Sequence, residues 1–254
     1  MTRDTIPILL YHSVTDDPAL EIRGFETPPA TFRRHLDRLT AGGFTSLTVT
    51  QLAGHLRDGA ASLPERPVVI TFDDGWADFA GAAEAMAERG LVATLYVTTG
   101  WLNRPGFLEA AQLPALTGLG MEIGAHSCTH PQLDTLRLDR LRSEISEPRR
   151  HLEDLLQHDV PSFAYPHGYS SATVRRLVRE TGYSSAAAVR NSLSSPSDDL
   201  FNLARLTVLP TTVDGDIDRW LAGTGALVAP YPERFRTKGW RIARRGRSRL
   251  RLPA

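Results

Sequence analysis

The chain has 254 residues, 41% hydrophobic and 23% charged, which is typical of one large soluble domain or two small ones. Basic and acidic residues number 29 each, and this balance argues against a nucleic-acid-binding protein, which normally carries a basic domain. The single cysteine, Cys128, excludes an internal disulfide framework and a structural zinc site built from cysteines.

The predicted elements alternate between strands and helices. Apolar and β-branched runs predict strands at 6–11, 44–48, 68–72, 93–97, 121–125, 162–165, 184–189 and 203–208. Amphipathic or alanine-rich segments predict helices at 31–41, 51–57, 77–89, 108–117, 139–156, 172–180 and 217–221, with a candidate kink at Pro148. This alternation predicts an α/β fold with parallel strands, and the chain length favours a barrel over an open sheet.

Polar side chains follow four of these predicted strands. His12 follows the first strand, Asp73 and Asp74 follow 68–72, and His126 follows 121–125. The segment 165–168 ends a fourth strand. Because the carboxyl ends of parallel strands meet at one face, we expect these residues to converge on a single site.

The adjacent carboxylates Asp73 and Asp74 are the first part of that site. Strand side chains alternate in direction, so one carboxylate can bind a metal while the other faces a substrate. Gly75 permits the tight turn that follows them. The alternative is that one of the two aspartates caps the helix beginning near Trp76.

The pair His126 and His130 is the second part. Histidines at i and i+4 lie on one face of a helical turn, which suits a shared divalent metal such as zinc, cobalt or nickel. Together with Asp74 they form a three-ligand set that leaves open positions, as in a catalytic metal site. The alternative is a structural or exposed histidine pair.

These motifs also carry a resemblance to a known family. Residues 71–75 (TFDDG), 126–130 (HSCTH) and 163–168 (FAYPHG), with weaker matches at 10–14 (LYHSV) and 203–208 (LARLTV), resemble polysaccharide deacetylases of the NodB-like carbohydrate esterase family. The resemblance implies a distorted (β/α)7 TIM-like barrel over residues 1–230. It also implies the metal-dependent removal of an acetyl group from an N-acetylated sugar.

The resemblance further implies roles for individual residues. Asp74, His126 and His130 would hold the metal, most simply zinc, and Asp73 would be the base that takes a proton from the attacking water. The metal and the backbone N–H of Tyr165 would stabilise the oxyanion. The substrate would contact Tyr165, Pro166, His167 and Trp76. Trp76 and Trp101 could form an aromatic wall for a sugar ring or could be core packing.

Two departures from the family pattern affect this assignment. Members usually supply the general acid from a Leu-x-His motif near the C-terminal end of the domain, but residues 183–230 contain no histidine. We expect His12 to be the substitute, as in the circularly permuted subgroup, with His167 as the second choice. The alternative is that His12 only hydrogen-bonds a loop. The arginine that usually precedes the third motif is also missing, and Arg205 could replace it beside Asp73 or be an ordinary surface residue.

The last segment, 231–254, is a basic tail. Nine basic and no acidic residues lie between Arg234 and Arg251. We expect this tail either to contact anionic lipids or a phosphorylated partner, or to be solvated or folded back on the acidic body. No apolar run is long enough to cross a membrane and no secretory leader is recognisable, so we expect a cytoplasmic protein, at the inner membrane surface if the tail binds lipid.

The sequence therefore predicts a deacetylase acting on an N-acetylated oligosaccharide, polysaccharide or lipid-linked glycan precursor. Two alternatives stay open. One is a related amidohydrolase that cleaves a non-sugar C–N bond. The other is a carbohydrate-binding relative that has lost turnover.

Overall fold

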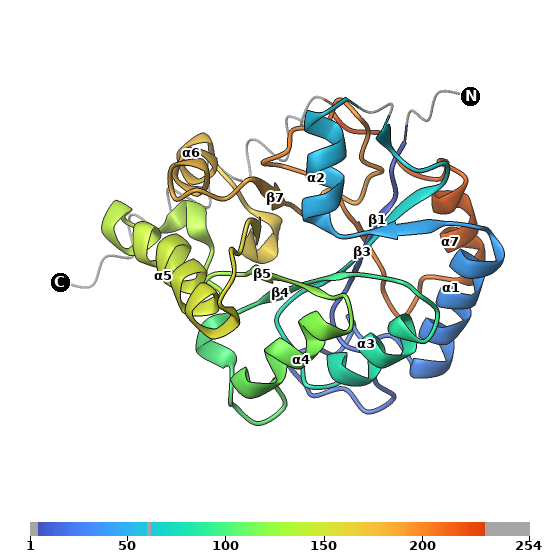
Figure 1. The fold of residues 1–254 in the computed structure, drawn as a ribbon, viewed down its shortest axis with the longest axis horizontal. Coiled ribbons are helices and arrows are strands. Elements are labelled where there is room, and N and C mark those ends of the chain that lie inside the picture. The colour runs from blue at the N-terminus through green and yellow to red at the C-terminus, as the bar shows by residue number, and fades with distance from the viewer. Residues whose placement is uncertain (1–4, 60–61, 232–254) are drawn as a thin grey trace.

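The computed structural model describes residues 5–59 and 62–231, so the basic tail beyond residue 231 lies outside the described residues. A parallel sheet forms its centre (Figure 1). The strands are β1 (Ile8–Tyr11), β2 (Thr45–Leu47), β3 (Pro67–Phe72), β4 (Thr94–Val97), β5 (Glu122–Ala125), β6 (Ser162–Ala164), β7 (Ser185–Ala187) and β8 (Leu206–Thr207). All the predicted strands are present, although 203–208 contracts to the two residues of β8.

The strand order is β7-β6-β5-β4-β3-β1-β8, and every pairing between the strands is parallel. β2 pairs with the first half of β3, whereas β4 pairs with its second half. An isolated parallel bridge joins Ala187 of β7 to Leu203, just before β8. The sheet thus curls toward closure, and the prediction of a distorted (β/α)7 barrel is confirmed.

Helices surround this sheet (Figure 1). They are α1 (Pro29–Ala41), α2 (Val49–Arg57), α3 (Phe79–Ala87), α4 (Leu113–Gly118), α5 (Leu138–Leu156), α6 (Ala172–Glu180) and α7 (Asp214–Leu221). Pro148 lies inside α5 without ending it. α3 begins two residues later than the sequence predicts, with Asp78 at its N-cap, so neither Asp73 nor Asp74 caps this helix. None of the helices in the described ranges is long and apolar enough to span a membrane.

Strand alternation divides the buried side chains into two groups. Leu9 and Tyr11 of β1 pack in the large cluster between sheet and helices, whereas Ile8 belongs to the smaller cluster inside the barrel. In β3 the residues Val68, Ile70 and Phe72 face the helices, and Val69 faces the interior. Because alternate residues point to the same side of a strand, residues 10 and 12 point inward like Ile8, and residues 71 and 73 point inward like Val69. The polar residues at the ends of these strands therefore face the interior of the barrel.

Candidate active site

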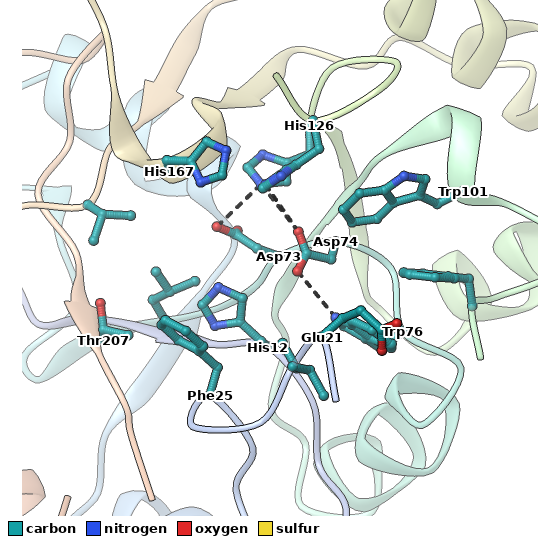
Figure 2. A pocket seen from close by; sticks show the side chains of 15 residues that line it. His12, Glu21, Phe25, Asp73, Asp74, Trp76, Trp101, His126, His167 and Thr207 are labelled. Carbon is teal, nitrogen blue, oxygen red and sulfur yellow. Dashed lines mark hydrogen bonds and ion pairs between the residues drawn. The ribbon is translucent and has the colours of Figure 1, made fainter. Parts of the chain in front are cut away.

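A cavity of about 690 Å³ opens where the carboxyl ends of β1, β3 and β5 meet (Figure 2). Its volume is within the usual range for a small-ligand site. Its polar lining includes His12, Asp73, Asp74, His126, His130 and His167. The structure therefore brings together six residues that the sequence singles out from four separate segments.

Asp73 lies on the inner side of the barrel and is held by Arg205. The two Nη atoms of Arg205 donate to the two carboxylate oxygens of Asp73 at 2.6 and 2.8 Å. Arg205 is fully buried and also donates to the carbonyl of Ala188 and to the hydroxyl of Thr71. Burial alone would raise the pKa of Asp73, but the charge and hydrogen bonds of Arg205 outweigh it and hold that pKa below its usual range. Asp73 is therefore ionised.

Asp74 turns into the same cavity through its backbone. A strand continuing past β3 would direct residue 74 away from the interior, but Asp74 has φ +79°, in the left-handed region. Its Oδ2 accepts a hydrogen bond from the indole Nε1–H of Trp76 at 3.2 Å. Burial, with the neighbouring charge on Asp73, raises the pKa of Asp74 to about 6.

His126 and His130 face Asp74 across the cavity. Their Nε2 atoms lie 3.6 and 3.4 Å from Oδ1 of Asp74 (Figure 2). The prediction that they share a helical turn is wrong, because residues 126–130 form a loop in which Ser127 and His130 have φ of +64° and +58°. The loop nonetheless directs both rings to one point.

The chemistry of this donor set fits a divalent metal. Nδ1 of His126 lies 2.9 Å from the carbonyl of Ala164, which only an N–H can satisfy, so the lone pair is on Nε2 and faces the cavity. Burial lowers the pKa of His126 to about 3 and also lowers that of His130, so both rings are neutral, as metal ligation requires. One ligand atom from each of His126, His130 and Asp74 lies within 4.8 Å of the others.

His12 lies at the end of β1, on the wall of the same cavity. Burial lowers its pKa, while the charges on Asp74 and Asp73 oppose that shift. Its Nδ1 has no hydrogen-bond partner within the described ranges. The ring of Phe25 packs 5.1 Å from its own ring, centroid to centroid. His12 thus reaches the cavity from a different strand than the candidate metal ligands.

The role predicted for Tyr165 does not fit the structure. Its backbone N–H donates to the carbonyl of Ala187 at 3.0 Å as part of the pairing of β6 with β7. Its buried hydroxyl donates to the carbonyl of Phe201. Pro166 is also buried, and neither residue is among the described residues that line the cavity. Tyr165 is therefore neither an oxyanion donor nor a substrate contact, whereas His167 and Trp76 do line the cavity.

An aromatic wall forms one side of the cavity. Trp76 stacks on Phe107 at 4.4 Å between ring centroids, and Trp101 packs 5.0 Å from Phe107. Trp101 also lies 5.1 Å from the ring of His130. Phe107 was not predicted from the sequence, because it lies in a loop between elements and belongs to no motif.

The cavity rim includes further residues that sequence reasoning did not find. Glu21, Ile22 and Phe25 come from the loop after β1, and Thr207 comes from β8. No pattern in the sequence indicates which side chains of the loop 15–29 reach the cavity. Thr207 points inward like Arg205, two residues earlier in the chain, and this alternation is the sequence feature from which it could have been predicted.

Known proteins share both the sequence motifs and the fold. The family model described as polysaccharide deacetylase matches residues 60–186, half of the chain, a segment that contains Asp73, Asp74, His126 and His130. YxkH of Bacillus subtilis (strain 168), whose name describes a polysaccharide deacetylase, is 25% identical over 207 residues, covering 81% of this chain and 72% of YxkH.

Two solved structures share the architecture. The deacetylase PplD of Streptococcus pyogenes, solved with acetate, is 23% identical, with a TM-score of 0.79 over 87% of this chain and 98% of PplD. BC0361, a polysaccharide deacetylase from Bacillus cereus, is 21% identical, with a TM-score of 0.75 over 86% of this chain and 68% of BC0361. At such identities these structures establish the fold, and the sequence match establishes the relationship. The chain belongs to the polysaccharide deacetylase family.

Proposed function

We propose that this protein is a metal-dependent hydrolase that removes N-acetyl groups from an N-acetylated amino sugar in an oligosaccharide, polysaccharide or lipid-linked glycan precursor. The observation that carries the proposal is the convergence, in one cavity, of the Asp74, His126 and His130 set with the buried pair of Asp73 and Arg205. Family membership supports the reaction class.

Asp74, His126 and His130 would hold the metal, with zinc preferred and cobalt or nickel as alternatives. When bound, such an ion polarises the acetyl carbonyl and lowers the pKa of a coordinated water. The protein fixes the orientation of each ligand beforehand. The carbonyl of Ala164 sets the tautomer of His126, and the indole of Trp76 holds the second oxygen of Asp74.

Asp73 is suited to act as the general base. Its Oδ2 lies 3.7 Å from Nε2 of His126, so it borders the position that the three ligands define. Arg205 keeps the carboxylate ionised and restricts it to one orientation, while each oxygen retains a lone pair that can accept a proton. The proton acceptor is therefore fixed before the substrate arrives.

His12 is suited to act as the general acid. The amine that leaves must receive a proton as the C–N bond breaks, because an amide anion is a very poor leaving group. His12 reaches the cavity from β1, on a wall separate from the loop that carries His126 and His130. Base and acid would then act from different strands on a substrate bound between them.

The aromatic wall favours a sugar as the substrate. Trp76, Phe107 and Trp101 line the cavity and pack on one another, and an aromatic wall of this kind suits the apolar C–H faces of a pyranose. The cavity volume of about 690 Å³ accommodates one sugar residue together with its acetyl group.

The proposal is tested by measuring acetate release from N-acetylglucosamine oligomers. The protein is stripped with a chelator and then given zinc, cobalt or nickel. We expect metal-restored release, and we expect Asp73→Asn to lower kcat about 10²–10⁴-fold while it still binds metal, because the variant loses the base and keeps the three proposed metal ligands. Asp154→Ala, an exposed change on α5, is the matched control and should behave as the wild type.

The other outcomes separate the alternatives. Tight metal binding without release from the oligomers would contradict that substrate, and release of an amine from a panel of small non-sugar amides would then identify a related amidohydrolase. A folded wild-type protein that binds no metal would contradict the proposed enzyme and favour a binding protein.

A further inference from the structure

The loop that carries His126 and His130 has a backbone that its own sequence does not favour. Ser127 and His130 both have left-handed φ values, which cost free energy for residues other than glycine. One internal bond helps, since the N–H of His130 donates to Oγ of Ser127 at 3.0 Å. A loop of this kind persists only where its surroundings hold it.

Glu144 of α5 holds the outer side of this loop. Its Oε2 accepts hydrogen bonds from the backbone N–H groups of Cys128 and Thr129, both at 2.9 Å. Its Oε1 accepts one from the hydroxyl of Thr129 at 2.5 Å. A single side chain from a neighbouring helix thus binds the middle of the loop at three points.

The burial of Glu144 shows that these bonds are its main stabilisation. The residue is only 4% exposed, and a buried carboxylate is costly unless it is well hydrogen-bonded. Its ion-pair partner within the described ranges is Arg140, whose Nε is 3.9 Å away on a side chain that is 63% exposed. Hydrogen bonds from backbone N–H groups to a carboxylate are short and strong, so they offset the desolvation.

The opposite side of the loop is held by the segment after β4. The N–H of Gly100 donates to the carbonyl of Cys128 at 2.8 Å, and the N–H of Thr99 donates to that of Ser127 at 3.2 Å. A Cβ at position 100 would lie 2.4 Å from the Cys128 oxygen, so only glycine allows this approach. The peptide groups between the two histidines are therefore fixed from both sides.

We propose that Glu144 is a positioning residue for the metal ligands. By fixing the Cys128 and Thr129 peptides, it sets the separation and orientation of His126 and His130 without contacting the metal or the substrate. This inference rests on the metal site of the proposed function. It concerns the geometry of that site and not the chemistry of deacetylation.

The test measures cobalt binding to the full chain in competition with a chelator, together with the visible absorption spectrum of the bound ion. Glu144→Ala should weaken binding about 10–100-fold and alter the spectrum, as expected when an outer partner of a ligand is lost. Glu144→Gln should restore most of the affinity, because its amide oxygen can accept both N–H groups and its amide nitrogen can donate to the Thr129 hydroxyl. Asp154→Ala on the same helix is the control.

The inference is overturned if folded Glu144→Ala binds cobalt with wild-type affinity and spectrum, or if Glu144→Gln fails to restore binding. If Glu144→Ala does not fold, Thr129→Val decides, since it removes one of the three bonds and should still weaken binding. Unchanged binding in that variant also overturns the inference. A wild type that binds no cobalt would instead contradict the proposed metal site itself.

Discussion

Two neighbouring carboxylates in this site have opposite electrostatic environments. Asp73 is held below its usual pKa beside Arg205, whereas burial raises the pKa of Asp74 to about 6. The difference comes from one guanidinium, which pairs with Asp73 through both nitrogens. Such a separation is typical of sites in which two acids have different tasks. In the proposed mechanism Asp74 would be a metal ligand, whereas Asp73 would accept a proton.

Removing Arg205 alone should be strongly destabilising. Arg205→Met leaves the buried carboxylate of Asp73 without its cation, and we expect a loss of about 3–5 kcal/mol in the free energy of unfolding. The double variant Asp73→Asn with Arg205→Met removes both charges and should recover part of that loss. Urea unfolding of the two single variants and the double variant gives the coupling energy. Simple additivity of the two single effects would contradict a direct, buried pairing.

At the scale of elements, strand alternation explains most of the site. His12, Asp73 and His126 all occupy inward positions that continue β1, β3 and β5. Side chains at the outward positions pack between the sheet and the helices. Among them, Tyr11 of β1 contacts His35 of α1, with its hydroxyl 3.0 Å from Nδ1.

The buried histidine of this contact, His35, predicts a pH dependence of the free energy of unfolding. Burial lowers the pKa of His35 to about 4, although Asp214 of α7 opposes the shift. The unfolded chain then binds a proton more readily than the folded one, so the stability contributed by neutral His35 is complete above pH 6.5 and is lost as the pH falls toward 4. We expect His35→Gln to lose less stability than the wild type between pH 7 and pH 4.5 in urea titrations. Equal losses would show that folding does not shift the pKa of His35.

Strand alternation also explains which parts of the site could be predicted from the sequence. The convergence of His12, Asp73 and the histidine pair could be predicted from the positions of the strand ends and from the alternating direction of side chains along each strand. The shape of the loop 126–130, with its left-handed residues, could not be predicted, because it is hydrogen-bonded to Glu144 and Gly100, which lie elsewhere along the chain. Tyr165 was misassigned because the register of β6 against β7, which occupies its N–H, is a tertiary property.

At the scale of the whole molecule, the candidate metal site joins separate parts of the barrel. Asp74 follows β3, and the two histidines follow β5, two strands away in the sheet. The second nitrogen of His126 is bound to the carbonyl of Ala164 in β6. A bound ion would therefore connect three strands and should stabilise the folded state as a whole.

Metal removal should lower the thermal stability of the protein. A metal present at 100 times its dissociation constant stabilises the folded state by about 2.7 kcal/mol. In a chain of this size we expect an increase of about 5–10 °C in Tm over the chelator-treated protein. Differential scanning calorimetry with and without zinc checks this shift. It should vanish in Asp74→Asn, and its persistence there would place the bound zinc elsewhere.

The place of β1 between β3 and β8 has a consequence for how the protein is made. Asp73 and Arg205 are 132 residues apart in sequence, so during synthesis the carboxylate is complete long before its cation exists. The proposed acid, His12, is among the first residues made, whereas β8, which flanks its strand, is the last strand in the described part of the chain. A nascent or prematurely ended chain that lacks residue 205 would have all three proposed metal ligands but no cation to fix the proposed base. Under the proposed mechanism, such shortened products would lack activity until the barrel is fully synthesised.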